Sequence, residues 1–147
     1  MTMRWEVRRL AALVVAALAL SACAGSGSVP QGAAQVPIRD FRQVAGKWDG
    51  NATGLTTGSD IQVFRLTIGE DGKYQAGTAQ MMGVYAGSGT LALQDGRLTT
   101  QGEDGTATYT LYESDGKRVL RLEGTVKPGR PVSANLTPSV AAAPKKK

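Results

Sequence analysis

The sequence predicts an all-β protein, a small antiparallel up-and-down meander of about eight strands that closes into a barrel. Three observations lead to this prediction. From residue 48 onward, apolar and polar residues alternate over short runs, which is the two-residue period of a half-buried strand. Asp-Gly pairs, a strong hairpin signal, recur between the runs. The connections are short, so strands that follow one another in the chain are expected to pair. A β-sandwich is the alternative.

The first 22 residues have the pattern of a secretory signal peptide. Three arginines precede an uncharged apolar run over residues 10–20, which is shorter than the roughly 20 residues of a membrane-spanning helix. Residues 20–23 then read LSAC, which resembles the lipobox of bacterial lipoproteins. The resemblance implies cleavage before Cys23, acylation of its thiol and new amino group, and a lipid anchor in the membrane.

The resemblance also implies a location in the cell envelope. In lipoproteins of two-membrane bacteria, Asp after the lipidated cysteine tends to retain the protein in the inner membrane. Ala24 stands at that position here, which implies the outer membrane, facing the periplasm. Cys23 is the only cysteine, so no disulfide is expected once it is acylated. Alternatively, Cys23 is an ordinary small residue near a standard cleavage site.

Residues 23–37 are predicted to form the lipidated cysteine and a flexible linker, because Gly, Ser, Ala and Pro dominate without an apolar period. The β-barrel domain is expected over residues 38–138. At its start, Asp40 is suited to N-cap a short helical turn. Phe41 and Val44 are three residues apart and share one face of that turn.

The strands are expected to follow in order, starting from GKWDGNATG at residues 46–54. The apolar residues that share a face are Phe64, Leu66 and Ile68; Tyr74, Ala76 and Thr78; Leu91, Leu93 and Leu98; Ala107, Tyr109 and Leu111; Leu120 and Leu122; and Val132, Ala134 and Leu136. The turns between them are Asp71-Gly72, Asp95-Gly96, Asp104-Gly105 and Asp115-Gly116. Closure into a barrel removes the exposed edges of the meander. Glycines in the middle strands are expected to bend the sheet, with an interior cavity as the alternative.

Residues 46–48, GKW, resemble the G-x-W motif of lipocalins and related eight-stranded calycins. The resemblance implies a lipocalin-like barrel in which Trp48 packs at the closed end against an arginine from a late strand. Arg118 and Arg121 are the candidates for that arginine. The chain departs from the family in its shorter length, in lacking a Thr-Asp-Tyr signature and in lacking a C-terminal helix pattern. A core aromatic is the simpler interpretation of Trp48.

Composition argues against catalysis and against nucleic-acid binding. The chain has no histidine, so it has no Ser-His pair and no histidine metal ligand. Most acidic residues are expected at hairpin tips in water. We therefore expect no enzyme, cofactor or metal. The net charge of +5 comes from the two ends of the chain, because residues 36–138 contain equal numbers of basic and acidic residues. Phosphate-backbone binding needs a basic surface, so we expect no nucleic acid.

Two binding functions remain open from the sequence. In the first, the anchored barrel binds a small apolar ligand or an envelope protein partner, and the candidate ligand-binding residues are Trp48, Met81, Met82, Tyr85 and Tyr109. The segment MMGVY, residues 81–85, is expected to plug the open end of the barrel or to offer an adaptable binding surface. In the second, a disordered basic tail, residues 139–147, links the membrane to peptidoglycan through Lys147.

Overall fold

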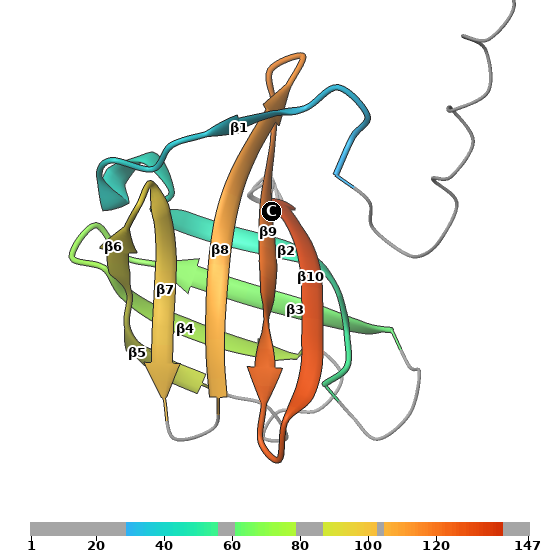
Figure 1. The fold of residues 1–147 in the computed structure, drawn as a ribbon. Helices are drawn as coiled ribbons and strands as arrows, with labels where there is room; N and C mark the ends of the chain where they lie inside the picture. Colours follow the sequence, from blue (N-terminus) through green and yellow to red (C-terminus); the bar gives the residue numbers. More distant parts are fainter. Residues whose placement is uncertain (1–28, 56–60, 79–86, 103–104, 140–147) are drawn as a thin grey trace, which may run out of the picture.

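The computed structural model describes residues 29–55, 61–78, 87–102 and 105–139. It confirms the all-β prediction, with one antiparallel sheet curved into a nearly closed barrel (Figure 1). The elements in chain order are β1 (Ala34–Val36), the 3-10 helix η1 (Phe41–Gln43), β2 (Gly46–Thr53), β3 (Gln62–Ile68), β4 (Lys73–Thr78), β5 (Gly87–Thr90), β6 (Ala92–Gln94), β7 (Arg97–Gly102), β8 (Gly105–Ser114), β9 (Lys117–Val126) and β10 (Arg130–Pro138).

The sheet has ten strands rather than about eight, and one extra strand lies in the segment expected to be a linker. Residues 34–36 form β1 and pair with residues 111–113 of β8. Strand β7 pairs with β8 only as far as Tyr109, which leaves this edge of β8 available to β1. The linker prediction for residues 23–37 is therefore wrong at its C-terminal end, because β1 satisfies free backbone groups of β8.

The other extra strand arises at Leu91, which divides one expected strand into β5 and β6. The Leu91 side chain is 3 % exposed and belongs to the core. Its backbone N–H donates to the carbonyl of Gly72 at 2.8 Å. Anchored in this way, the chain leaves β4, the partner of β5, and continues as β6 alongside β7.

Pairing of the first long strand with the last joins the two halves of the sheet. The sheet order is β5-β4-β3-β2-β10-β9-β8-β7-β6, so β2 joins β10 in the only pairing along this path between strands distant in sequence. The register places Gly50 opposite Leu136 and Ala52 opposite Ala134. The two ends of the sheet, β5 and β6, are not paired with each other among the described residues. We call the gap between β4–β5 and β6–β7 the seam.

The barrel interior contains the apolar faces that the alternation predicts. Its fully buried residues include Leu66, Ile68, Leu98, Leu111, Leu120 and Leu136. Leu93 differs from the prediction, because 38 % of its surface is exposed although it lies opposite buried Leu98. Leu93 lies on β6, the end strand of the sheet, and therefore has a strand neighbour on one side only.

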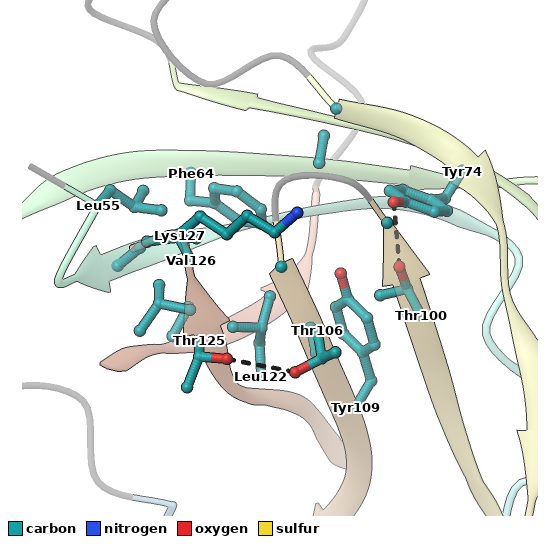
Figure 2. A pocket seen from close by; sticks show the side chains of 18 of the residues that line it. Leu55, Phe64, Tyr74, Thr100, Thr106, Tyr109, Leu122, Thr125, Val126 and Lys127 are labelled. Atoms are coloured by element: carbon teal, nitrogen blue, oxygen red, sulfur yellow. Dashed lines mark hydrogen bonds between the residues drawn. The ribbon is translucent and has the colours of Figure 1, made fainter. Parts of the chain in front are cut away.

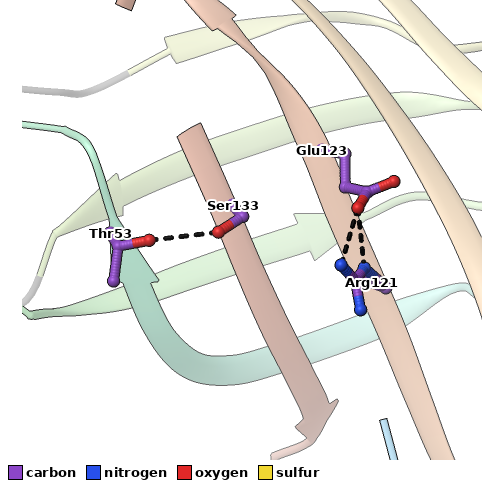
Figure 3. A network of polar contacts seen from close by, with 4 residues as sticks. All are labelled: Thr53, Arg121, Glu123 and Ser133. Carbon is purple, nitrogen blue, oxygen red and sulfur yellow. Dashed lines mark hydrogen bonds and ion pairs between the residues drawn. The ribbon is translucent and has the colours of Figure 1, made fainter. Parts of the chain in front are cut away.

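Polar residues on the outer surface form hydrogen bonds, one of them across the β2–β10 ladder. Figure 3 shows the hydroxyl groups of Thr53 on β2 and Ser133 on β10, which are 3.0 Å apart at directly paired positions. On β9, Arg121 donates two hydrogen bonds to one carboxylate oxygen of Glu123, at 2.9 and 2.7 Å. Exposed pairs of this kind contribute about 0–1 kcal/mol, so the interior, rather than these contacts, holds the barrel together.

Two of the four expected Asp-Gly turns have the predicted backbone. Asp95-Gly96 has φ of 52° and 73°, and Asp115-Gly116 has φ of 51° and 72°, as a type I′ turn requires. At the first site only Gly72 has positive φ. There the loop is longer, closed by a hydrogen bond of 2.8 Å from the Gly69 N–H to the Lys73 carbonyl. Asp104 lies outside the described residues.

The short helical turn predicted after the linker is confirmed as η1. The Asp40 carboxylate accepts a hydrogen bond from the Arg42 N–H at 3.0 Å, which is the interaction of an N-cap. The Gln43 side chain accepts from the Asp40 N–H at 3.2 Å and completes a capping box. Val44 follows and is completely buried, so η1 closes one end of the barrel (Figure 1).

Candidate ligand-binding pocket

A pocket of about 630 Å³ lies at the end of the barrel opposite η1. Its rim comes from the last residues of β7 and β9 and the first residues of β5, β8 and β10. Figure 2 shows the side chains that surround it. The described lining residues are Ala52, Leu55, Phe64, Tyr74, Ala76, Gly87, Ser88, Thr100, Gly102, Gly105, Thr106, Ala107, Tyr109, Leu122, Thr125, Val126, Lys127, Val132 and Ala134.

The two halves of the barrel differ in how completely their inward-facing residues fill the interior. The closed half is filled by Trp48, Leu66, Ile68, Leu111, Leu120 and Leu136. In the other half, four alanines line the wall, which are Ala52, Ala76, Ala107 and Ala134. Alanine leaves volume that leucine fills. Gly87 and Gly102 also line the pocket, so the interior cavity, which was the alternative interpretation of the middle-strand glycines, is present alongside the alanines.

Tyr109 is the one described sequence candidate that lines the pocket. It is 2 % exposed, and Figure 2 shows its hydroxyl group pointing into the pocket. Burial raises the pKa of the Tyr109 phenol well above its ordinary value, with a smaller contribution from Tyr74. The phenol therefore stays protonated at neutral pH and can donate a hydrogen bond. Within the described part of the chain, no hydrogen bond of this hydroxyl is recorded.

A side-chain hydrogen bond crosses the seam beside the pocket. The hydroxyl groups of Tyr74 on β4 and Thr100 on β7 are 3.2 Å apart (Figure 2). These strands are not paired in the sheet. Strand β5, which borders the seam, has the sequence GSGT and so carries no large side chain. The Tyr74 ring thus covers part of the seam, and an added Cβ at Gly89 would be 3.1 Å from it.

The rim carries polar groups that the sequence did not single out. Thr106 and Thr125 have their hydroxyl groups 3.3 Å apart across β8 and β9. Lys127 follows β9 directly and is the only charged side chain among the described lining residues. Figure 2 shows it extending across the pocket. The sequence places Lys127 at the end of a strand, and therefore at one end of the barrel. It does not show which end of the barrel is open, so Lys127 could not be assigned to a pocket from the sequence.

The structure places Trp48, a sequence-predicted ligand-binding residue, away from the pocket. Trp48 is 2 % exposed, lies outside the described lining of the pocket and donates from Nε1 to the Val44 carbonyl at 2.8 Å. The Arg118 guanidinium carbon is 5.6 Å from the centre of its ring, and Arg118 also donates to the Gln43 carbonyl. Arg118 is therefore the arginine that packs on Trp48, whereas Arg121 contacts Glu123 on the outer surface.

The other sequence-predicted sites lie outside the described residues. They are Cys23, Met81, Met82, Tyr85 and Lys147. Within the described ranges, no group of three acidic, histidine or cysteine side chains is placed to hold a metal ion. Also within those ranges, no helix has the length and apolar character needed to span a bilayer.

The protein is therefore an antiparallel barrel whose interior is filled at the η1 end and contains a pocket at the other end. Comparisons with protein-family models, curated proteins and solved structures found no match to the chain. The likeness to lipocalins therefore rests on the barrel architecture and on the packing of Trp48 with Arg118 at the closed end.

Proposed function

We propose that the protein is a lipid-anchored, non-catalytic barrel of the bacterial envelope that binds a small apolar ligand in its open half. The pocket of about 630 Å³ carries this proposal. Pockets for small molecules commonly measure about 300–1,000 Å³ and combine apolar walls with a few polar groups. Here Phe64, Leu122 and Val132 supply apolar wall, while the Tyr109 hydroxyl supplies a polar group inside it.

A barrel with a completely filled interior would argue against a carrier. The four alanines leave space in one half of this barrel instead. A monomeric domain gains stability when side chains fill its interior. Larger residues at the four alanine positions would add such packing, and the alanines lack it in one half of the barrel. A structural tether has no need of such a hollow. Lys147 lies outside the described residues, and the pocket is the observation that favours the carrier.

Filling the pocket is expected to abolish ligand binding. Ala76 lines the pocket from β4, and Ala76→Trp would occupy the space of the ligand. N-phenylnaphthylamine, a neutral dye that fluoresces in apolar surroundings, reports binding to the purified protein. Its affinity should fall at least about tenfold in Ala76→Trp, which is about 1.4 kcal/mol.

Gln75→Trp is the matched control for this experiment. Gln75 is the preceding residue on the same strand, it is exposed and does not line the described pocket. The control should bind the dye as the unmodified protein does, and circular dichroism should show both variants folded. Equal dye binding by Ala76→Trp and the unmodified protein, with both folded, would contradict the proposal.

The proposed anchor depends on the Cys23 thiol. We expect labelled palmitate to be incorporated in a bacterial host and the protein to fractionate with membranes. Cys23→Ser should abolish both, because serine cannot accept lipid through a thioether. Ser21→Ala serves as a control that keeps a small residue before the cysteine. Membrane fractionation that persists in Cys23→Ser would show that another feature anchors the chain.

A further inference from the structure

The described lining of the pocket contains one cationic side chain and no acidic one. Lys127 is exposed and reaches across the pocket in Figure 2. The four ion pairs recorded between described residues are Arg42–Glu70, Arg65–Asp49, Lys73–Asp71 and Arg121–Glu123. None of them involves Lys127, so its ammonium group has no carboxylate partner in the described part of the chain.

The polar donors and the apolar wall lie at different depths in the pocket. Lys127 lies at the rim, where a charged partner keeps part of its hydration. Below it, the Tyr109 hydroxyl points into the pocket with its proton retained. The walls below the rim are formed by Phe64, Leu122 and the alanines. A buried anion without a partner is strongly unfavourable, so an acidic group would stay at the rim and an alkyl chain would enter first.

We propose that the pocket selects amphiphiles with a single anionic headgroup, and that Lys127 sets this preference. The inference rests on the proposed ligand-binding function and adds the class of ligand and its orientation. The alkyl chain lies against the apolar wall. The headgroup, a carboxylate or a phosphate, accepts from the Lys127 ammonium at the mouth. The described lining contains a cation and no carboxylate, which favours an anionic headgroup over a cationic one of equal size.

The test compares amphiphiles that share one chain and differ in headgroup. Dodecanoate, dodecyl phosphate, dodecanol and dodecyltrimethylammonium each displace N-phenylnaphthylamine from the purified protein. Dodecanoate should bind about fivefold more tightly than dodecanol, because an exposed ion pair contributes about 1 kcal/mol at most. The cationic amphiphile should bind most weakly. The preference should decrease at high salt, since charges at the mouth are screened.

Lys127→Gln should remove the preference for dodecanoate over dodecanol, because glutamine carries no charge. Lys127→Arg should retain the preference, because the positive charge remains. Lys117→Gln is the matched control, because Lys117 is exposed at the start of β9, the strand that Lys127 follows, and lies outside the described lining. Its binding should equal that of the unmodified protein.

The outcomes separate this inference from the function on which it rests. If neither the dye nor any amphiphile binds, the proposed carrier function is overturned, and the headgroup preference with it. If dodecanol and dodecanoate compete equally well, or if Lys127→Gln keeps the preference, the pocket binds apolar chains and only the role of Lys127 is overturned. Binding of dodecanoate with no binding of dodecyl phosphate would restrict the headgroup to a carboxylate.

Discussion

Gly50→Ala is expected to lower the free energy of unfolding by about 3 kcal/mol. Gly50 lies on β2 opposite Phe64 of β3 and Leu136 of β10. An added Cβ would overlap the carbonyl oxygen of Asn135 and lie 3.0 Å from the Leu136 Cα. These neighbours are backbone atoms, which cannot move as a flexible side chain does. The β2–β10 ladder, which joins the two halves of the sheet, must therefore shift. Urea unfolding followed by Trp48 fluorescence measures the loss.

The control is Gly87→Ala on β5. Gly87 also lies in a strand, and an added Cβ there would meet nothing within 4 Å. Its unfolding free energy should stay within about 0.5 kcal/mol of that of the unmodified protein. The two variants make the same chemical change, so their difference measures the close approach of β2 to β10. Equal stability of Gly50→Ala and Gly87→Ala would show that the ladder tolerates a methyl group at residue 50.

Trp48→Ala is expected to lower the free energy of unfolding by about 3–5 kcal/mol. The indole is buried, donates to the Val44 carbonyl and packs against Arg118. Its removal leaves a cavity at the closed end and an unpaired Val44 carbonyl. Thermal unfolding followed by circular dichroism measures the effect, since this variant has lost the fluorophore of the barrel.

The same variant separates a structural role of Trp48 from a ligand-binding one. Trp48 lies outside the described pocket lining, so the folded variant should bind N-phenylnaphthylamine with an affinity within about twofold of normal. Trp48→Phe, which keeps most of the apolar volume, should lose less stability and provides a folded variant for this comparison. A strong loss of dye affinity in folded Trp48→Phe would return Trp48 to the ligand site.

The local features of the fold could be predicted from the sequence because each depends on residues close together in the chain. Alternation put Phe64, Leu66 and Ile68 on one face, and all are buried. Asp95-Gly96 formed the turn that its composition favours. The expectation that Asp40 caps a helical turn was also met. The G-x-W resemblance correctly placed Trp48 against an arginine, although it left open whether Arg118 or Arg121 would supply it.

The pocket could not be predicted with the same confidence, because it depends on side chains from strands that are distant in sequence. Ala52 and Ala134 lie opposite each other in the β2–β10 ladder, 82 positions apart in the printed sequence (134 − 52 = 82). A single alanine in a strand does not indicate a cavity. Four of them on one half of a barrel do, and only the register of the strands brings them together.

By itself, the sequence determined the strand alternation, the hairpin turns, the capped turn before the barrel and the balance of basic and acidic residues in the body of the chain. These follow from side-chain size, polarity and backbone preference within a few residues. Only the tertiary structure decided that β2 pairs with β10, that β1 extends β8 and which half of the barrel is hollow. Those outcomes depend on long-range strand pairing, in which backbone hydrogen bonds and packed side chains select one register among several that the same local pattern permits.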